Sequence, residues 1–289
     1  MSNNKRIYLI TGANRGIGKG IVEMILKKNE INNNIIISSR ILENSKKTYG
    51  EFCEKYPNQV NNLDFIKLDI DSISDVMQCN HYIKNKYGYL SVLFNNAAIV
   101  DREVDSNPKS DKFIKNAIQT LSINYFSQVY LTETLKPLIL KAPKSTNPHI
   151  VFLSSNFGRR SFENQDMMNL FNNVKNLKDL DEIYNKYLTD IMQGNLEKWK
   201  TTWTSNAWSY CLSKTMIDCY MQIIAKELEN SGILSNCFDP GWVKTDMGGK
   251  EAPSTVEDSV ETASFLDEIK IISKENTGKI CINKKLISV

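Results

Sequence analysis

A tyrosine and a lysine are spaced for chemistry in the stretch AWSYCLSK, which covers residues 207–214. Tyr210 and Lys214 are four residues apart, so on a helix their side chains lie on one face, one turn apart. A phenol is a weak acid at neutral pH, and a nearby cation stabilises its deprotonated form and lowers its pKa. The pair could therefore exchange a proton with a bound molecule. The alternative is a surface helix with a solvated lysine.

A glycine-rich turn near the amino terminus indicates phosphate binding. The stretch TGANRGIG has glycines at 12, 16 and 18, follows a short apolar run and opens a helical pattern. Glycines let a backbone turn sharply and approach a pyrophosphate closely, and the N–H groups and dipole of a helix N-terminus attract its charge. A tight turn without a ligand is the alternative, but the position after the first strand of an alternating chain favours a dinucleotide.

Composition excludes several other classes of protein. The chain has 289 residues, of which 41% are hydrophobic and 24% charged, and its net charge of +3 is spread out, which gives no case for nucleic acid or an anionic membrane. No apolar run approaches the roughly 20 residues that cross a bilayer, and the first strand begins too early for a signal peptide. His81 and His149 are far apart, so no histidine metal site is expected. Six cysteines without CxxC spacing indicate free thiols in a reducing, cytoplasmic compartment.

Short apolar, β-branched runs alternate with helical patterns along the chain. The runs are apolar throughout, which fits strands covered on both faces, as in a parallel sheet. Their order predicts a Rossmann-like, doubly wound α/β fold with a mostly parallel seven-stranded sheet and helices on both faces. An eight-stranded α/β barrel is the alternative, but only seven strands are found. The expected strands cover residues 6–11, 35–38, 63–69, 91–95, 149–154, 233–238 and 278–284, and a long helix is expected at 111–141.

Further motifs resemble those of the short-chain dehydrogenase/reductases. Besides the glycine turn and the Tyr-x-x-x-Lys pair, the chain has NNAA at 95–98, an SSNFG stretch that contains Ser155 and Gly158, and DPGWVKTDM at 239–247. Ala98 departs from the pattern, because the family has glycine at that position. The motifs follow one another in the family's order on the expected elements. The resemblance covers nearly the whole chain.

The resemblance implies catalytic roles for four side chains. Tyr210 would donate a proton to a carbonyl oxygen, and Ser155 would bond that oxygen. Lys214 would lower the pKa of the phenol and hold the nicotinamide ribose. Asn124, in SINYFS, would hold a water that links Lys214 to solvent, or its amide would bond backbone at a helix bend; Ser127 stands where this family motif has glycine. Ser154 is expected to point away, because neighbours on a strand face opposite sides.

Residues near the end of the second strand favour NADPH as the cofactor. An acidic residue there selects NAD through its ribose hydroxyl, whereas an arginine accommodates a 2′-phosphate. Here the strand ends in ISSR, which supplies Arg40, and Arg15 in the glycine turn adds a second guanidinium. The resemblance implies that Asp69 bonds the adenine and Thr245 the nicotinamide amide. The expected cofactor contacts are Gly12, Asn14, Arg15, Gly16, Ile17, Gly18, Arg40, Asp69, Ile70, Asn95, Ala97, Tyr210, Lys214, Pro240, Gly241, Val243 and Thr245.

A long segment separates Ser155 from Tyr210. The two residues are 55 positions apart (210 − 155), and most members of the family have a much shorter segment there. Within it, DMMNLFNNV and LDEIYNKYLTDIMQ are typical of amphipathic helices. A helical insertion at about 160–205, together with PGWVKTDM, resembles the monomeric NADPH-dependent carbonyl reductases. We therefore expect one domain over residues 1–289, with the insertion covering the face through which most relatives dimerise, and hence a monomer.

The expected activity is NADPH-dependent reduction of ketones, aldehydes or quinones to alcohols. The small-molecule substrate would contact Ser155, Tyr210 and Trp242. An alcohol-oxidising steroid or pterin dehydrogenase is an alternative with the same residues. A dinucleotide-sensing module is a third possibility, but it would need no proton donor. For the tryptophans near the substrate side, core packing explains their presence as well as ligand contact does; these are Trp199, Trp203, Trp208 and Trp242.

Overall fold

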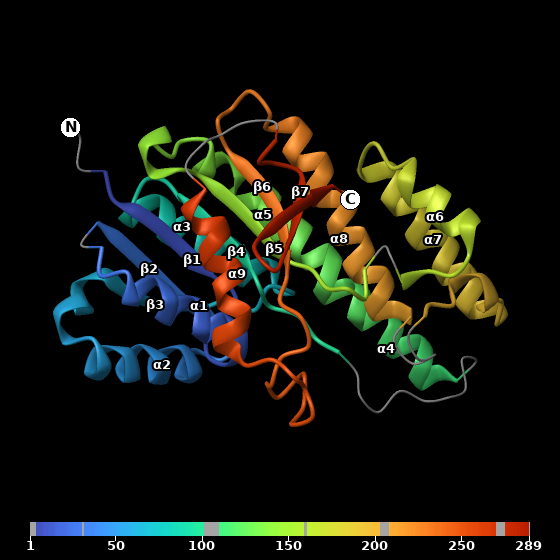
Figure 1. Ribbon diagram of the computed structural model, residues 1–289, viewed down its shortest axis with the longest axis horizontal. Helices are drawn as coiled ribbons and strands as arrows, with labels where there is room; N and C mark the ends of the chain where they lie inside the picture. The colour runs from blue at the N-terminus through green and yellow to red at the C-terminus, as the bar shows by residue number, and fades with distance from the viewer. Residues whose placement is uncertain are drawn as a thin grey trace.

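The computed structural model contains one central β-sheet flanked by helices, as Figure 1 shows. It describes residues 4–30, 32–100, 110–158, 161–202, 208–269 and 275–288. Within these ranges the sheet has eight strands in the order β3-β2-β1-β4-β5-β6-β7-β8, and all neighbours are parallel except β7 and β8. The open, doubly wound sheet confirms the expected fold and excludes a closed barrel. The strands are β1 Arg6–Ile10, β2 Asn33–Ser39, β3 Leu63–Lys67, β4 Val92–Asn95, β5 His149–Leu153, β6 Leu234–Asp239, β7 Lys279–Ile282 and β8 Lys285–Ser288.

The expected count of seven strands is wrong by one. The stretch 278–284 was expected to be a single final strand, but β7 turns back at Asn283 and pairs antiparallel with β8. Asn283 and Lys284 have φ values of 48° and 62°. Two successive left-handed residues form the tight hairpin turn whose twist matches that of the flanking strands. The sequence carries no glycine at this turn, so the usual signal for a hairpin is missing.

The helices cover both faces of the sheet and form two cores. Alternate residues of β1 point to opposite faces, so Ile7 and Leu9 join one core while Tyr8 and Ile10 join the other. Helices α3, α4, α5 and α8 form the first core, and α1, α2 and α9 form the second. The helices are α1 Gly16–Lys27, α2 Leu42–Lys55, α3 Ile73–Lys86, α4 Asp111–Leu121, α5 Ser127–Ile139, α6 Gln165–Asn172, α7 Leu177–Gln193, α8 Trp208–Glu227 and α9 Val256–Glu268, and short 3₁₀ turns cover Pro57–Asn62, Lys144–Thr146 and Glu197–Trp199.

The long helix expected at 111–141 is interrupted at its centre. A π-helical turn, Ser122–Phe126, joins α4 to α5 and contains Asn124. Such π-turns often occur at functional sites, because they displace a side chain from the regular helical position. Pro137 lies in the last turn of α5, and the helix ends two residues later at Ile139. A proline this close to the end of a helix is compatible with the helix stopping there.

The insertion between β5 and α8 is helical and packs on the first core. Helix α7 contacts α4 and α8 and buries Leu180, Ile183 and Tyr187. A capping box at Asn176 begins this helix, and Gly194 in the left-handed conformation ends it. In Figure 1, α6 and α7 lie beside α8, at the side of the molecule farthest from β3. Helix α7 of the insertion therefore packs on both α4 and α8.

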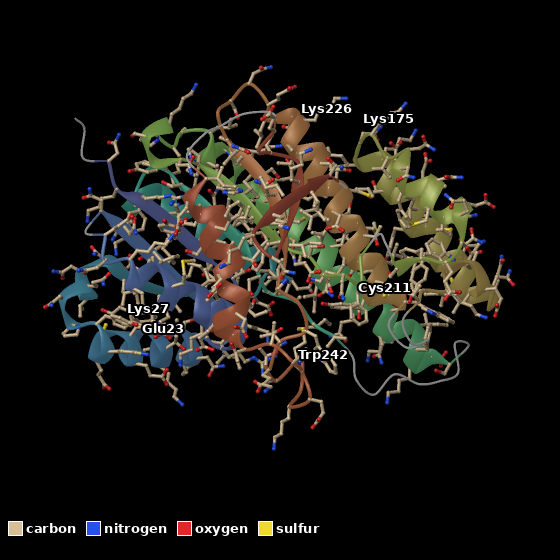
Figure 2. All side chains as sticks on the ribbon, viewed as in Figure 1. Glu23, Lys27, Lys175, Cys211, Lys226 and Trp242 are labelled. Carbon is tan, nitrogen blue, oxygen red and sulfur yellow. The ribbon has the colours of Figure 1, made fainter. Side chains whose placement is uncertain are left out.

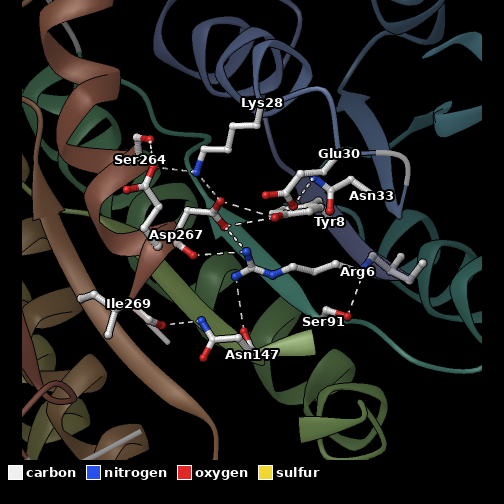
Figure 3. A network of polar contacts seen from close by, with 12 residues as sticks. Arg6, Tyr8, Lys28, Glu30, Asn33, Ser91, Asn147, Ser264, Asp267 and Ile269 are labelled. Atoms are coloured by element: carbon white, nitrogen blue, oxygen red, sulfur yellow. Dashed lines mark hydrogen bonds and ion pairs between the residues drawn. The ribbon is translucent and has the colours of Figure 1, made fainter. Parts of the chain in front are cut away.

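An ionic network holds α9 against the amino-terminal end of β1 (Figure 3). Asp267, in the last turn of α9, is 2.8 Å from Arg6 Nη1 and 2.8 Å from Lys28 Nζ. The Tyr8 hydroxyl donates a hydrogen bond of 3.2 Å to the same carboxylate. Burial, and then the charge of Asp267, raise the pKa of Tyr8, so this phenol stays protonated. The network lies at the edge of the sheet opposite to the one at which the site residues are found.

None of the helices formed by the described residues combines the length and the hydropathy that a membrane span requires.

Candidate active site

The expected site residues follow the carboxyl ends of the central strands. The glycine turn follows β1, Ser155 follows β5, and the Pro240 loop follows β6. In a parallel sheet these ends lie at one edge, where α/β proteins bind their ligands. Figure 2 shows Cys211, the neighbour of Tyr210, and Trp242, in the loop after β6, on this side of the molecule. The fold thus brings segments from the whole chain to one edge of the sheet.

The glycine turn forms a close-packed cradle. Gly12 and Gly16 have φ values of 64° and 52°, which glycine adopts without strain. A Cβ atom on Gly18 would lie 2.5 Å from both Asn96 Nδ2 and the Gly12 carbonyl oxygen, so a side chain there would not fit. Helix α1 begins directly after Arg15, and no side chain caps its N-terminus. The N–H groups of its first turn are therefore available to an anion such as a pyrophosphate.

A loop after β6 closes against this turn. A Cβ atom on Gly16 would lie 3.3 Å from Thr245 Cγ2, so the Thr245 side chain approaches the Gly16 backbone closely. The Arg15 guanidinium forms a 2.7 Å ion pair with the Asp246 carboxylate, and both side chains are mostly exposed. Arg40, directly after β2, is also exposed. The two guanidinium groups that were expected to hold a 2′-phosphate are therefore on the surface.

Asn95 does not present its side chain to a cofactor. The residue is 0% exposed, and its Nδ2 donates a 3.1 Å hydrogen bond to Thr132 Oγ1 in α5. The side chain at this strand position therefore faces the core, and the expected contact of Asn95 with the cofactor stays a prediction. The next residue, Asn96, donates a 2.7 Å bond to the Thr11 carbonyl oxygen and holds the glycine turn. Asn96 was not among the residues predicted from the sequence. Because neighbours on a strand face opposite sides, the two adjacent asparagines of NNAA could have indicated that one side chain faces the core and the other faces the glycine turn.

The remaining expected cofactor residues differ in their accessibility. Asp69 is half-buried after β3 and accepts a 3.2 Å bond from the Asp71 N–H. Ala97 donates its N–H to Thr11 Oγ1 at 2.9 Å. Positions that stay partly or fully exposed are Asn14, Ile17, Asp69, Ala97, Pro240, Gly241 and Thr245, whereas Ile70 and Val243 are buried.

Tyr210 and Lys214 lie together at the start of α8. Lys214 Nζ is 5.5 Å from the centroid of the Tyr210 ring and donates a 2.6 Å hydrogen bond to the Leu153 carbonyl oxygen. Lys214 is 0% exposed, so its ammonium is bonded within the protein and is not presented to solvent. Burial lowers its pKa to about 8. Tyr210 and Lys214 thus form the pair on one face of a helix that their spacing in the sequence predicted.

The pKa of Tyr210 is shifted in the direction opposite to the one expected. Burial of the phenol raises its pKa, and the Cys211 thiol adds to that increase. A hydrogen bond with Ser155 acts in the other direction and favours the phenolate. Desolvation therefore outweighs the effect of neighbouring groups, and Tyr210 is protonated at neutral pH. Sequence spacing alone does not reveal burial, which is why the expectation was wrong.

Ser154 and Ser155 point to opposite sides of the chain, as expected. Ser155 interacts with the Tyr210 phenol and favours its charged form, and its Oγ accepts a 3.2 Å bond from the Phe157 N–H. The Phe157 ring packs edge-on against the Tyr210 ring with 6.0 Å between centroids. Ser154 Oγ instead donates a 2.5 Å bond to Asp218 in the interior. The serine that can reach a ligand is therefore Ser155.

Asn124 binds backbone on both sides of its amide. Its Oδ1 accepts the Ile99 N–H at 2.8 Å, and its Nδ2 donates to the Ile99 carbonyl oxygen at 2.8 Å. Of the two roles expected for Asn124, the structure therefore shows the second, in which the amide bonds backbone at an irregular turn of the helix. Ser127, which replaces a glycine of the family motif, donates a 2.7 Å bond to Asp71 Oδ1. This bond attaches the π-turn to the loop that carries Asp69.

The tryptophans divide between core and surface. Trp199 is buried, and its Nε1 donates a 2.9 Å bond to Asp190 in the insertion. Trp208 is buried against Phe113, with 6.4 Å between ring centroids. Trp242 is 55% exposed and donates a 2.7 Å bond to the Gly248 carbonyl oxygen. Of the described tryptophans, Trp242 is therefore the one open to a ligand, and Trp203 lies outside the described residues.

Two buried carboxyl groups near the pair were missed from sequence. Asp239, at the end of β6, accepts a 2.8 Å bond from the Gly241 N–H and a second bond from the Asn156 N–H. Asp239 thus joins the turn that begins at Ser155 to the loop after β6 that contains Pro240. Asp218 lies one turn beyond Lys214 on α8. Among the described residues, no group of three or more His, Cys, Asp or Glu side chains could hold a metal ion.

Comparison with known proteins identifies the family. Residues 6–167 match the model of the short chain dehydrogenase family. The chain is 28% identical to carbonyl reductase (NADPH) 3 of Homo sapiens, covering 98% of each chain, and 28% identical to carbonyl reductase (NADPH) 1 of Sus scrofa, covering 99% of this chain and 95% of that one.

Solved structures show the same fold. Salutaridine reductase from Papaver somniferum superposes with a TM-score of 0.79 at 22% identity, covering 96% of this chain and 99% of that chain. The NADPH-bound carbonyl reductase from chicken fatty liver gives a TM-score of 0.72 at 21% identity, covering 99% of this chain and 100% of that chain. With a family model that matches more than half of its residues, the chain belongs to the short chain dehydrogenase family.

Proposed function

We propose that the protein reduces carbonyl compounds to alcohols with NADPH, acting on ketones, aldehydes or quinones. One observation carries the proposal: Tyr210 lies beside Lys214 and interacts with Ser155, at the edge of the sheet where the glycine turn is found. A proton donor, a hydroxyl for the carbonyl oxygen and a cation are the groups that carbonyl reduction needs from a protein. A dinucleotide sensor has no use for them.

The residues at the glycine turn fit a dinucleotide. Gly12, Gly16 and Gly18 leave room for a pyrophosphate at the uncapped N-terminus of α1. Arg15 and Arg40 are exposed and would hold the 2′-phosphate that distinguishes NADPH from NADH. Asp69 and Thr245 would contact the adenine and the nicotinamide amide. When bound, the cofactor supplies the hydride that the carbonyl carbon accepts.

The side chains of this chain supply the proton and orient the substrate. Because burial raises the pKa of Tyr210, its phenol is protonated at neutral pH, which is the form that a proton donor requires. The Ser155 hydroxyl would bond the carbonyl oxygen as that oxygen gains negative charge. The Lys214 ammonium would stabilise the phenolate that remains after the transfer. Trp242, exposed in the loop after β6, would contact the substrate.

The named relatives support this activity. Two proteins that are 28% identical to this chain over nearly its full length are called carbonyl reductase (NADPH). Their coverage of the chain includes the insertion between Ser155 and Tyr210, because 98% and 99% of this chain is aligned. A common reaction and a common cofactor are therefore the simplest assignment for this chain.

We further propose that the protein is a single-domain monomer in the cytoplasm. Helix α7 covers α4 and α8, the two helices that relatives use for dimerisation, which supports a monomer. Both cores share the strands of one sheet, which supports one domain. All six cysteines are free thiols, five of them buried, which supports a reducing compartment.

The proposed function is tested with a panel of carbonyl compounds. Menadione, isatin and a steroid ketone are each mixed with the purified protein and NADPH, and loss of the reduced cofactor is followed by its absorbance. We expect oxidation of NADPH with at least one member of the panel, and a lower rate with NADH. Turnover of the corresponding alcohols with NADP+, but of none of the carbonyl compounds with NADPH, would instead support an alcohol-oxidising dehydrogenase.

A further inference from the structure

A buried carboxyl group lies directly behind the candidate catalytic pair. Asp218 is four residues after Lys214 on α8, so the two side chains share one helical face. Lys214 is 0% exposed and Asp218 is 1% exposed. Carboxylates are rarely buried unless their charge has partners, so this position needs an explanation. The proton transfer proposed above does not use it.

The Asp218 carboxyl contacts three other segments of the site. Its Oδ1 accepts a 2.5 Å hydrogen bond from Ser154 Oγ at the end of β5. The Cys237 thiol of β6 forms a second hydrogen bond with the carboxyl. A Cβ atom on Gly158 would lie 2.7 Å from Asp218 Oδ2, so the turn after Ser155 approaches closely and only glycine fits at 158. The carboxyl thus connects β5, β6 and the Ser155 turn to α8.

The groups around Lys214 come from two elements. Asp218 and Tyr210 lie on its own helix, and Cys237 and Asp239 lie on β6. Burial lowers the pKa of Lys214 to about 8, and Asp218 is the strongest of the neighbours that oppose this. Burial also raises the pKa of Asp218 to about 7, and it raises the pKa of Asp239. The negative charge of Asp218 and the positive charge of Lys214 each favour the charged form of the other group.

We propose that Asp218 is a positioning residue for the reaction, which holds the Ser155 turn against α8 and keeps Lys214 positively charged at alkaline pH. This rests on the proposed function, because Lys214 acts by stabilising the phenolate of Tyr210. A phenolate that forms beside a neutral lysine lacks this stabilisation. Activity should therefore persist to higher pH with the Asp218 carboxylate than without it.

The first test compares pH profiles of kcat/KM for carbonyl reduction. Asp218→Asn keeps an oxygen that accepts from Ser154 but removes the charge. Asp190→Asn is the matched control, because Asp190 is also a buried carboxylate, but it bonds Trp199 in the insertion. We expect the alkaline limb of Asp218→Asn to move to lower pH by about one unit, and that of the control to stay in place. A loss of kcat/KM that is equal at every pH, with the alkaline limb at its wild-type position, would overturn the proposal.

The second test needs no turnover and uses the protein without cofactor. Because the folded-state pKa of Asp218 is raised, the native state binds more protons than the unfolded state between about pH 4 and about pH 7. The contribution of Asp218 to the wild-type Tm should therefore fall as the pH rises through this range, and Asp218→Asn should lose this contribution, whereas buried His149, whose pKa is lowered to about 3, acts in the opposite direction in both proteins. Asp190→Asn should keep the contribution of Asp218. A difference in Tm between wild type and Asp218→Asn that is the same at every pH would show packing alone and would refute the charge role.

Ser154→Ala tests the same idea if Asp218→Asn does not fold. The Ser154 hydroxyl favours the charged form of the carboxyl, so its removal should raise the pKa of Asp218 further. The fall in the contribution of Asp218 to Tm should then extend to higher pH, and the alkaline limb of activity should again move to lower pH. Unchanged profiles in both measurements would contradict the proposal. Because the Tm series does not depend on a substrate, it remains decisive even if the protein reduces no carbonyl compound.

Discussion

The Arg15 guanidinium is 2.7 Å from the Asp246 carboxylate, so an ion pair joins the glycine turn to the loop after β6. The side chains are 70% and 73% exposed. Arg15 is one of the two groups proposed to hold the 2′-phosphate of NADPH. Asp246 would therefore compete with the cofactor for the same guanidinium.

We expect Asp246→Asn to bind NADPH more tightly. An exposed ion pair contributes about 0.2–1 kcal/mol, so release of Arg15 should lower the Kd of NADPH by at most about fivefold. Isothermal titration calorimetry measures this directly. NADH is the internal control, because it has no 2′-phosphate and its Kd should change less. An equal change for both cofactors would mean that Arg15 does not contact the phosphate.

Tyr210→Phe should remove turnover but preserve cofactor binding. The phenolic proton takes part in the chemistry, whereas the ring packs against Phe157 and remains in the variant. General acid–base groups contribute about 10²–10⁴-fold to rate, so kcat should fall by that factor. NADPH binding, followed by fluorescence, serves as the control for folding. A variant that keeps more than about a tenth of the wild-type kcat would contradict the assignment of Tyr210.

Arg40→Asp should narrow or invert the preference for NADPH over NADH. The change removes a cation from the end of β2 and puts a carboxylate there that could accept a hydrogen bond from a ribose hydroxyl. A charge-assisted hydrogen bond contributes roughly 1.5–3 kcal/mol, so the KM for NADPH should rise by about tenfold to a hundredfold. Steady-state kinetics with both cofactors gives the ratio. Equal KM values in the wild type would already argue against the two-arginine site.

The protein should remain a monomer at all concentrations. Helix α7 buries its apolar side chains against α4 and α8, so these faces are covered within one chain. Light scattering behind a sizing column should give a mass near 33.0 kDa, the mass of one chain. A concentration-independent mass of about 66 kDa, twice that of the chain, would show that another surface forms a dimer.

Asp267→Asn should destabilise the fold without changing the site. The substitution leaves Arg6 largely buried without its carboxylate, whereas Lys28 keeps its 3.2 Å ion pair with Glu268 (Figure 3). Removal of one partner from a buried ion pair lowers the free energy of unfolding by about 3 kcal/mol or more. Urea denaturation measures the loss. Glu182→Gln is the control, because its pair with Lys178 is 4.0 Å long and exposed, and it should change stability by at most about 0.5 kcal/mol.

The sequence by itself was enough for features that depend on a few neighbouring residues. The alternation of apolar strands and amphipathic helices predicted the doubly wound sheet, because burial on both faces demands apolar runs. The turn of Gly12, Gly16 and Gly18 could be recognised because its backbone needs glycine. Tyr210 and Lys214 could be paired from their spacing on one helix. The hairpin of β7 and β8 was missed, because Asn283 and Lys284 form it without the usual glycine.

Only the tertiary structure decided the electrostatics around those residues. The pKa of Tyr210 is raised and that of Lys214 lowered, because segments distant in sequence bury Lys214 completely and Tyr210 in part. Asp218 is near Lys214 in sequence, but its contact with Ser154 depends on how β5 packs against α8. The Asn95 side chain points into the core, where it donates a hydrogen bond to Thr132 of α5. Burial is a property of the packed molecule, so no local pattern in the sequence could reveal these effects.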